Sequence, residues 1–107
     1  MPKRYVNKAL SNTKDVVQAG RTLIHGWNIQ NPNASAVYVQ FFNKLTANVT
    51  VGTTVNDYSL HLAANSSVYT DRNKPLDFTV GLVVAATTTE SGSTAPGAAL
   101  QVHIDYR

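Results

Sequence analysis

The sequence predicts an all-β fold, an antiparallel sandwich of about eight strands with a jelly-roll-like arrangement. Short runs in which apolar and polar residues alternate recur along the 107-residue chain. Clusters of turn-forming residues separate these runs at intervals of roughly 8–12 positions. An immunoglobulin-like sandwich has a similar number of strands, so it remains the alternative.

The first clear strand covers residues 22–29, in which apolar and polar side chains alternate. Gly26 inside this run indicates a bulge or the close approach of another backbone. Turn-forming residues 30–35 end the strand. The next strand, residues 36–43, carries aromatic side chains on both faces. A strand that is apolar on both faces is central in its sheet or covered by another chain.

The second half of the chain continues this pattern. Residues 46–54 are rich in Thr and Val and contain a break at Gly52. Residues 71–75 are expected to form a charged loop, and residues 87–97 a flexible loop of low complexity. Further strands are predicted at residues 58–62, 67–70, 76–87 and 100–107. The only helix candidate is residues 11–18.

Charge is scarce and lies mainly at the N-terminal end. Charged residues make up 14% of the chain, and the formal net charge is +3. Residues 1–21 hold five basic residues against one acidic residue, so the rest of the chain is close to neutral. We therefore divide the chain into an extended basic arm, residues 1–13, and a single sandwich domain, residues 14–107. The charge of the arm is too dilute for nucleic acid to be an expected partner.

The residue types needed for chemistry are few. The chain has no cysteine, which excludes disulfides and thiol nucleophiles. Its three histidines, His25, His61 and His103, lie within alternating strands without an adjacent nucleophile. His103 and Asp105 share a strand face, but two ligands are too few for a metal site. We predict no catalytic, cofactor-binding or metal site, and thus a protein that is not an enzyme.

The N-terminal segment and the length of the apolar runs predict where the protein resides. No apolar segment follows the basic start as in a secretory signal, and no run approaches the length of about 20 residues that a spanning helix needs. We expect synthesis in a cytoplasm and no contact with a membrane. The expected contacts are with protein, through the N-terminal arm and the two-sided strand. The interface candidates are Lys3, Arg4, Tyr5, Lys8, Tyr38 and Phe42.

A series of motifs from residue 18 to residue 107 resembles small β-sandwich structural proteins of tailed bacteriophage virions. These motifs are Ala19–Leu23, Gly26–Asn33, Val37–Phe42, Asp77–Thr87, the Thr-rich loop and Asp105–Arg107. The resemblance implies a capsid cement or decoration protein, or a small tail-associated protein, located in the virion. It also implies a homotrimer that binds the major capsid protein or another virion protein.

Two functions therefore remain open. The first is a structural cement subunit, which stabilises a phage head by spanning junctions between larger subunits. The alternative is a lectin-like or receptor-binding tail module, which needs an exposed aromatic side chain with polar neighbours. Trp27 is the candidate ligand contact for that alternative, and the loop at residues 87–97 is the other candidate region.

Overall fold

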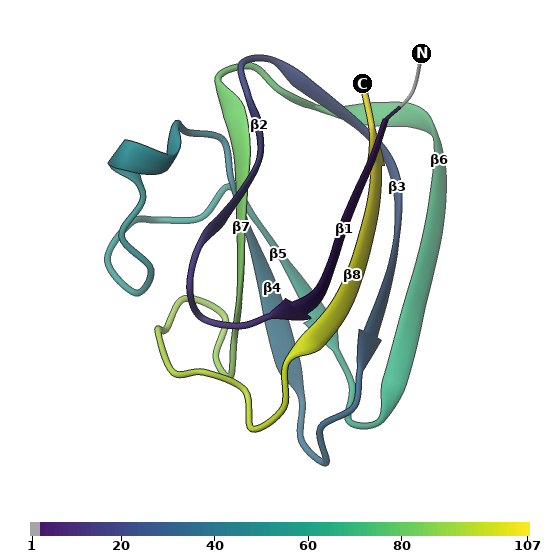
Figure 1. Ribbon diagram of the computed structural model, residues 1–107, viewed down its shortest axis with the longest axis vertical. Coiled ribbons are helices and arrows are strands. Elements are labelled where there is room, and N and C mark those ends of the chain that lie inside the picture. Colours follow the sequence, from purple (N-terminus) through teal and green to yellow (C-terminus); the bar gives the residue numbers. More distant parts are fainter. Residues whose placement is uncertain (1–2) are drawn as a thin grey trace.

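The computed structural model describes residues 3–107, in which two four-stranded antiparallel sheets pack face to face (Figure 1). One sheet has the strand order β1-β8-β3-β6 and the other has the order β2-β7-β4-β5. A short 3-10 helix, η1 (Thr46–Asn48), follows β4. The strands are β1 (Lys3–Leu10), β2 (Asp15–Ala19), β3 (Thr22–Asn31), β4 (Val37–Phe42), β5 (Tyr58–Leu62), β6 (Ser66–Phe78), β7 (Gly81–Thr87) and β8 (Leu100–Tyr106).

The strand order is that of a jelly roll. Strand β4 pairs with β5, β3 with β6, β2 with β7 and β1 with β8. These nested pairs are what results when one long antiparallel hairpin is rolled into two sheets. An immunoglobulin-like sandwich instead places its first, second, fourth and fifth strands in one sheet. The predicted sandwich is confirmed, and the immunoglobulin-like alternative is wrong.

Side-chain alternation fills the space between the sheets. In β8, Leu100, Val102 and Ile104 are fully buried, whereas the residues between them face outward. Trp27 packs against Phe41 with 5.6 Å between the ring centroids. Burial of a large apolar side chain contributes roughly 1.5–3 kcal/mol, so this core is the main source of stability. Its buried members are Leu10, Ile24, Trp27, Ile29, Val37, Val39, Phe41, Leu62, Phe78, Leu82, Val84, Ala86, Leu100, Val102 and Ile104.

The central strands β7 and β4 of the sheet β2-β7-β4-β5 are covered on both faces. All residues of β7 are buried, and a second apolar cluster forms on the outer face from Phe42, Val83 and Val49. Val49 comes from the segment that follows β4, so the chain itself covers this face (Figure 1). The two-sided apolar strand β4 is central, as predicted, and its cover is this chain's own loop.

Buried polar side chains hold the covering loops in place. Gln40 is fully buried, and its amide nitrogen donates to the hydroxyl of Thr87 at 2.7 Å and to the carbonyl of Gly92 at 3.0 Å. The side-chain nitrogen of Asn56 donates to Oε1 of Gln40 and to the backbone carbonyl of Glu90. The loop at residues 87–97 was predicted to be flexible, but these bonds fasten it to β4.

The predicted N-terminal arm is part of the sandwich. Residues 3–10 form β1, which pairs with β8 from Lys3 opposite Tyr106 to Leu10 opposite Leu100. Leu10 is 1% exposed and belongs to the core. The boundary between an arm at residues 1–13 and a domain at residues 14–107 is therefore wrong for residues 3–13, while residues 1–2 lie outside the described part. The pattern is weak in the sequence because β1 is an edge strand with mostly polar side chains.

The predicted loop at residues 71–75 lies within β6 as a large bulge. Ile24 pairs with Leu76 and Gly26 pairs with Asp71, so residues 72–75 have no partner on β3. A Cβ atom at Gly26 would lie 2.5 Å from the carbonyl oxygen of Thr70 on β6. The close backbone approach and the irregularity predicted at this glycine are both confirmed.

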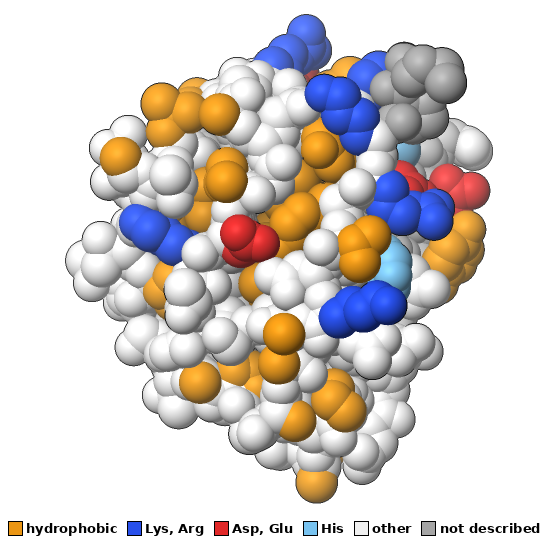
Figure 2. All heavy atoms as spheres, viewed as in Figure 1, with side chains coloured by type: hydrophobic (Ala, Val, Ile, Leu, Met, Phe, Trp, Pro, Cys, Tyr) orange, Lys and Arg blue, Asp and Glu red, His pale blue; other side chains and the backbone are white. Residues whose placement is uncertain are grey.

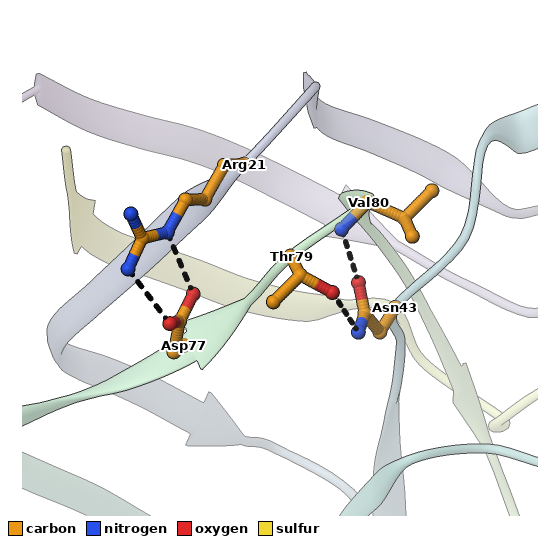
Figure 3. Close-up of polar contacts among 5 residues, drawn as sticks. All are labelled: Arg21, Asn43, Asp77, Thr79 and Val80. Carbon is orange, nitrogen blue, oxygen red and sulfur yellow. Dashed lines mark hydrogen bonds and ion pairs between the residues drawn. The ribbon is translucent and has the colours of Figure 1, made fainter.

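Polar side chains also fix the turn between β6 and β7 (Figure 3). The side-chain oxygen of Asn43 accepts from the backbone nitrogen of Val80 at 2.8 Å, and its nitrogen donates to the hydroxyl of Thr79 at 3.3 Å. Nearby, Arg21 and Asp77 form a bidentate pair with distances of 3.1 and 2.8 Å. The Arg21 guanidinium lowers the pKa of Asp77 below its ordinary value. These contacts join this turn to the end of β4 and the start of β3.

Candidate interaction surface

The outer face of the sheet β1-β8-β3-β6 is not covered by another segment of residues 3–107, whereas the central strands of the other sheet are covered. Alternation along β1, β8, β3 and β6 directs every second side chain away from the core. We call this surface the open face. Two of its apolar side chains are well exposed, Tyr69 at 72% and Val6 at 48%. The open face consists of Arg4, Val6, Gly26, Asn28, Gln30, Ser67, Tyr69, Asp71, Gln101, His103 and Asp105.

Strand pairing arranges these residues in rows across the sheet. The central row runs from Val6 on β1 through His103 and Asn28 to Tyr69 on β6. Cross-strand neighbours in a sheet lie about 4.5–5.5 Å apart. This row therefore places an aliphatic side chain at one end, an aromatic side chain at the other, and two hydrogen-bonding groups between them.

The rows on either side of the central row are polar. One runs from Arg4 through Asp105 and Gly26 to Asp71. It is basic at the β1 end and acidic at the β6 end, and it has no side chain at the glycine. The third row contains Gln101, Gln30 and Ser67. Figure 2 shows basic, acidic and histidine side chains gathered on the right of the view, over β1 and β8.

An ion pair orients Arg4 on the open face. Its Nε donates to Asp105 Oδ1 at 2.7 Å and its Nη2 donates to Oδ2 at 3.4 Å. The hydrogen bond to Asp105 is the main reason that the pKa of Arg4 is raised. Both side chains remain largely exposed, so the pair fixes geometry more than it adds stability. The remaining guanidinium donors of Arg4 are free to bind a carboxylate of another molecule.

A hollow of about 500 Å³ lies at one end of the open face. It is lined by Lys3, Arg4, His25, Asp105 and Arg107. The Nε2 atom of His25 is buried and has no hydrogen-bond partner. The hollow therefore combines three cationic side chains with one carboxylate and one imidazole.

The structure separates the interface candidates on β1. Arg4 lies on the open face, and Lys8 is also exposed. Lys3 donates to the side chain of Gln18 at 3.1 Å. Tyr5 faces inward, where its hydroxyl donates to Asp15 Oδ2 at 2.5 Å. Burial, followed by this hydrogen bond, raises the pKa of Tyr5 above its ordinary value.

The other candidates lie elsewhere. Tyr38 is half-buried on the second sheet, edge-on to His61 at 5.2 Å between ring centroids. Phe42 is fully buried under the chain's own loop, so its prediction as an interface residue is wrong. Trp27 is 3% exposed within the core, so it cannot be the ligand contact of the alternative function.

Tyr69 and Asn28 were not among the predicted site residues. In the sequence, Tyr69 lies between Val68 and Thr70 in a predicted strand, and nothing there shows whether its side chain faces the core or the solvent. Only the pairing of β6 with β3 shows that Val68 faces the core and Tyr69 faces outward. The one available signal was the charged segment after Tyr69, which marks β6 as an edge strand.

Within residues 3–107, no group of three or more His, Cys, Asp or Glu side chains lies close enough to hold a metal ion. That part of the chain also has no helix that is long and apolar enough to cross a membrane. Comparison of the chain with family models, curated proteins and solved structures found no match.

Proposed function

We propose that the protein is a virion structural subunit of the capsid cement or decoration type. In this role it stabilises a phage head through protein–protein contacts, with the major capsid protein or another virion protein as its partner. The observation that carries the proposal is the open face, a broad sheet surface with mixed polar, charged and apolar side chains. Such a surface matches the composition of protein interfaces.

The fold is compatible with this role without selecting it. Jelly rolls occur in viral capsid domains and also in lectin domains, and a fold alone does not specify a function. The low content of charged residues, 14%, adds support, since charged residues are depleted at the core of protein interfaces.

A subunit that spans a junction needs at least two contact surfaces. The second one that the structure offers is the segment covering the sheet β2-β7-β4-β5. It presents Val55 at 82% exposure and Leu45 at 44% exposure. We propose this segment as the contact with the shell, because it lies on the opposite side of the sandwich from the open face (Figure 1).

The test is binding to capsids assembled from the major capsid protein of the genome that encodes this chain. We expect saturable binding and a higher temperature of capsid disruption. The variants Val55→Asp and Leu45→Asp should weaken binding, whereas the matched control Ala64→Asp, in the turn before β6, should not. The proposal would be contradicted if the protein bound capsids neither before nor after their maturation.

A second candidate function is a glycan-binding tail module, and one observation favours it. Tyr69 offers an exposed ring beside Asn28, with His103 one strand further along the same row, and an aromatic ring with amide and imidazole groups in its row can bind a sugar. This module would use Tyr69 in place of the buried Trp27. A glycan array with the wild-type chain and Tyr69→Ala tests it, and binding that the variant retains would exclude this site.

A further inference from the structure

We infer that the open face is self-complementary and pairs with the open face of a second copy of this chain. The inference rests on the order of residues within the rows, and it goes beyond the proposed function by naming the occupant of the same face. A two-fold axis parallel to the strands sets β1 of one copy over β6 of the other, and β8 over β3. Each row then lies opposite the same row of the second copy, in reverse order, as an isologous contact requires.

Charge complementarity supports this pairing in the first row. Under the two-fold operation Arg4 of one copy lies opposite Asp71 of the other, and the contact occurs twice. Arg4 already binds Asp105 within its own chain through two of its donors. Its remaining donors are available for a second carboxylate, so Arg4 can bind Asp71 of the other copy while it keeps its bonds to Asp105.

The central row is complementary in polarity. Val6 of one copy lies opposite Tyr69 of the other, which covers the two most exposed apolar side chains of the face. His103 lies opposite Asn28, where an imidazole nitrogen and an amide can form a hydrogen bond. In the third row Gln101 lies opposite Gln30. No row places like charges opposite each other.

The size of the face sets the strength of the contact. Four strands about 4.8 Å apart and seven residues about 3.3 Å apart give a footprint of about 440 Å² on each copy. Because side chains protrude from the sheet, the area buried on both copies together rises to about 1,000 Å², which is the lower limit for a specific interface. We therefore expect a dimer with a dissociation constant in the micromolar range.

The first experiment is sedimentation velocity over a concentration series of the full chain. We expect a shift from monomer to dimer in the micromolar range. Tyr69→Ala should weaken the dimer about tenfold or more, because aromatic side chains contribute strongly at the centre of interfaces. The matched control Val55→Ala removes a side chain of equal or greater exposure from the opposite side and should leave the dimer unchanged.

A charge exchange tests the geometry of the pairing. Arg4→Glu alone and Asp71→Arg alone each create two like-charged contacts, so each variant should be monomeric. A mixture of the two variants contains two opposite-charged contacts per heterodimer, so dimers should return. A misfolded variant would not be rescued in this way, which separates loss of contact from loss of structure.

Three results would overturn the inference. The first is a chain that stays monomeric at its highest soluble concentration. The second is a dimer or trimer that Tyr69→Ala and Asp71→Arg leave unchanged. The third is a mixture of Arg4→Glu and Asp71→Arg that remains monomeric. Since none of these measurements involves a capsid, they can fail while capsid binding succeeds.

Discussion

At the scale of single residues, the backbone of β6 restricts position 26 to glycine. A Cβ atom at Gly26 would lie 2.5 Å from the carbonyl oxygen of Thr70, which is held in the ladder between β3 and β6. We expect Gly26→Ala to lower the free energy of unfolding by about 1–3 kcal/mol, as measured by urea denaturation. In the control Gly97→Ala, the nearest atom to the new Cβ is 3.4 Å away. Equal destabilisation by both variants would contradict the steric explanation.

Ionisation of Tyr5 makes the free energy of unfolding depend on pH in the alkaline range. Burial and the hydrogen bond to Asp15 raise the pKa of Tyr5 in the folded chain, whereas in the unfolded chain the phenol ionises near pH 10, roughly its ordinary value. Above that pH the unfolded state binds fewer protons than the folded state, so the free energy of unfolding falls as pH rises. This stabilisation is fully present below about pH 10.

Replacement of Tyr5 by Phe removes the group responsible for this decline. Urea denaturation at about pH 8 and about pH 11 should show a smaller loss of stability in Tyr5→Phe than in the wild-type chain. The variant also loses the hydrogen bond to Asp15, so the comparison is between the changes with pH and not between absolute stabilities. Identical pH dependence in both chains would rule out Tyr5 as the titrating group.

Residue identity predicted exposure poorly at the candidate site. Phe42 and Trp27 were chosen as contact residues because they are large and aromatic, yet both are buried. Their neighbours Val83, Phe41 and Tyr58 come from other strands or from distant positions in the chain. When a strand is apolar on both faces, the pairing of strands determines which segment covers each face. A sequence pattern does not show which strands pair.

At the scale of elements, the sequence predicted strands that have at least one continuous apolar face. Strands β3, β4, β5 and β8 follow the predicted ranges within a few residues. The pattern failed where a strand is at an edge or is interrupted. β1 has mostly polar side chains, and β6 contains the unpaired residues 72–75. Residues 46–54 form η1 and turns instead of a strand. Their apolar residues Val49 and Val51 pack onto the outer face of the sheet β2-β7-β4-β5.

Strand β1 provides the sharpest test at this scale. A detached arm could be removed without loss of folding, but β1 pairs with β8 and contributes Leu10 and Tyr5 to the core. Deletion of residues 3–10 should therefore lower the free energy of unfolding by more than about 4 kcal/mol, as the loss of two large core side chains implies. The measurement is thermal and urea denaturation followed by circular dichroism.

A truncated chain with unchanged stability would restore the arm hypothesis for residues 3–10. The matched control is Lys8→Ala, which shortens an exposed side chain of the same strand and leaves the pairing with β8 intact. Surface substitutions of this kind change stability by less than about 0.5 kcal/mol.

At the scale of the whole molecule, the symmetry of assembly separates two expectations. The resemblance to virion proteins implies a trimer, in which each subunit uses two different patches. The proposed pairing of the open face with a second copy would instead produce two-fold contacts.

The nested strand pairs also predict how the chain folds. The connection between β4 and β5 is far shorter than that between β1 and β8, whose residues Arg4 and Asp105 are 101 positions apart. Forming the inner pairs first shortens the loop that each outer pair has to close. We therefore expect folding in milliseconds to seconds, as is usual for sandwiches, with the pairing of β1 and β8 as a late step.

Two core substitutions test this order, with Trp27 fluorescence in stopped-flow experiments as the readout. Leu62 is fully buried on β5 in the innermost pair, and Leu10 is 1% exposed on β1 in the outermost pair. Leu62→Ala should mainly slow folding, whereas Leu10→Ala should mainly speed unfolding. Both substitutions should lower the free energy of unfolding by about 2–5 kcal/mol. A change of this size is large enough to measure, for each variant, the ratio of the change in folding activation energy to the change in stability. If Leu10→Ala slows folding as much as Leu62→Ala does, then β1 and β8 pair before the rate-limiting step, and the inner-to-outer order is wrong.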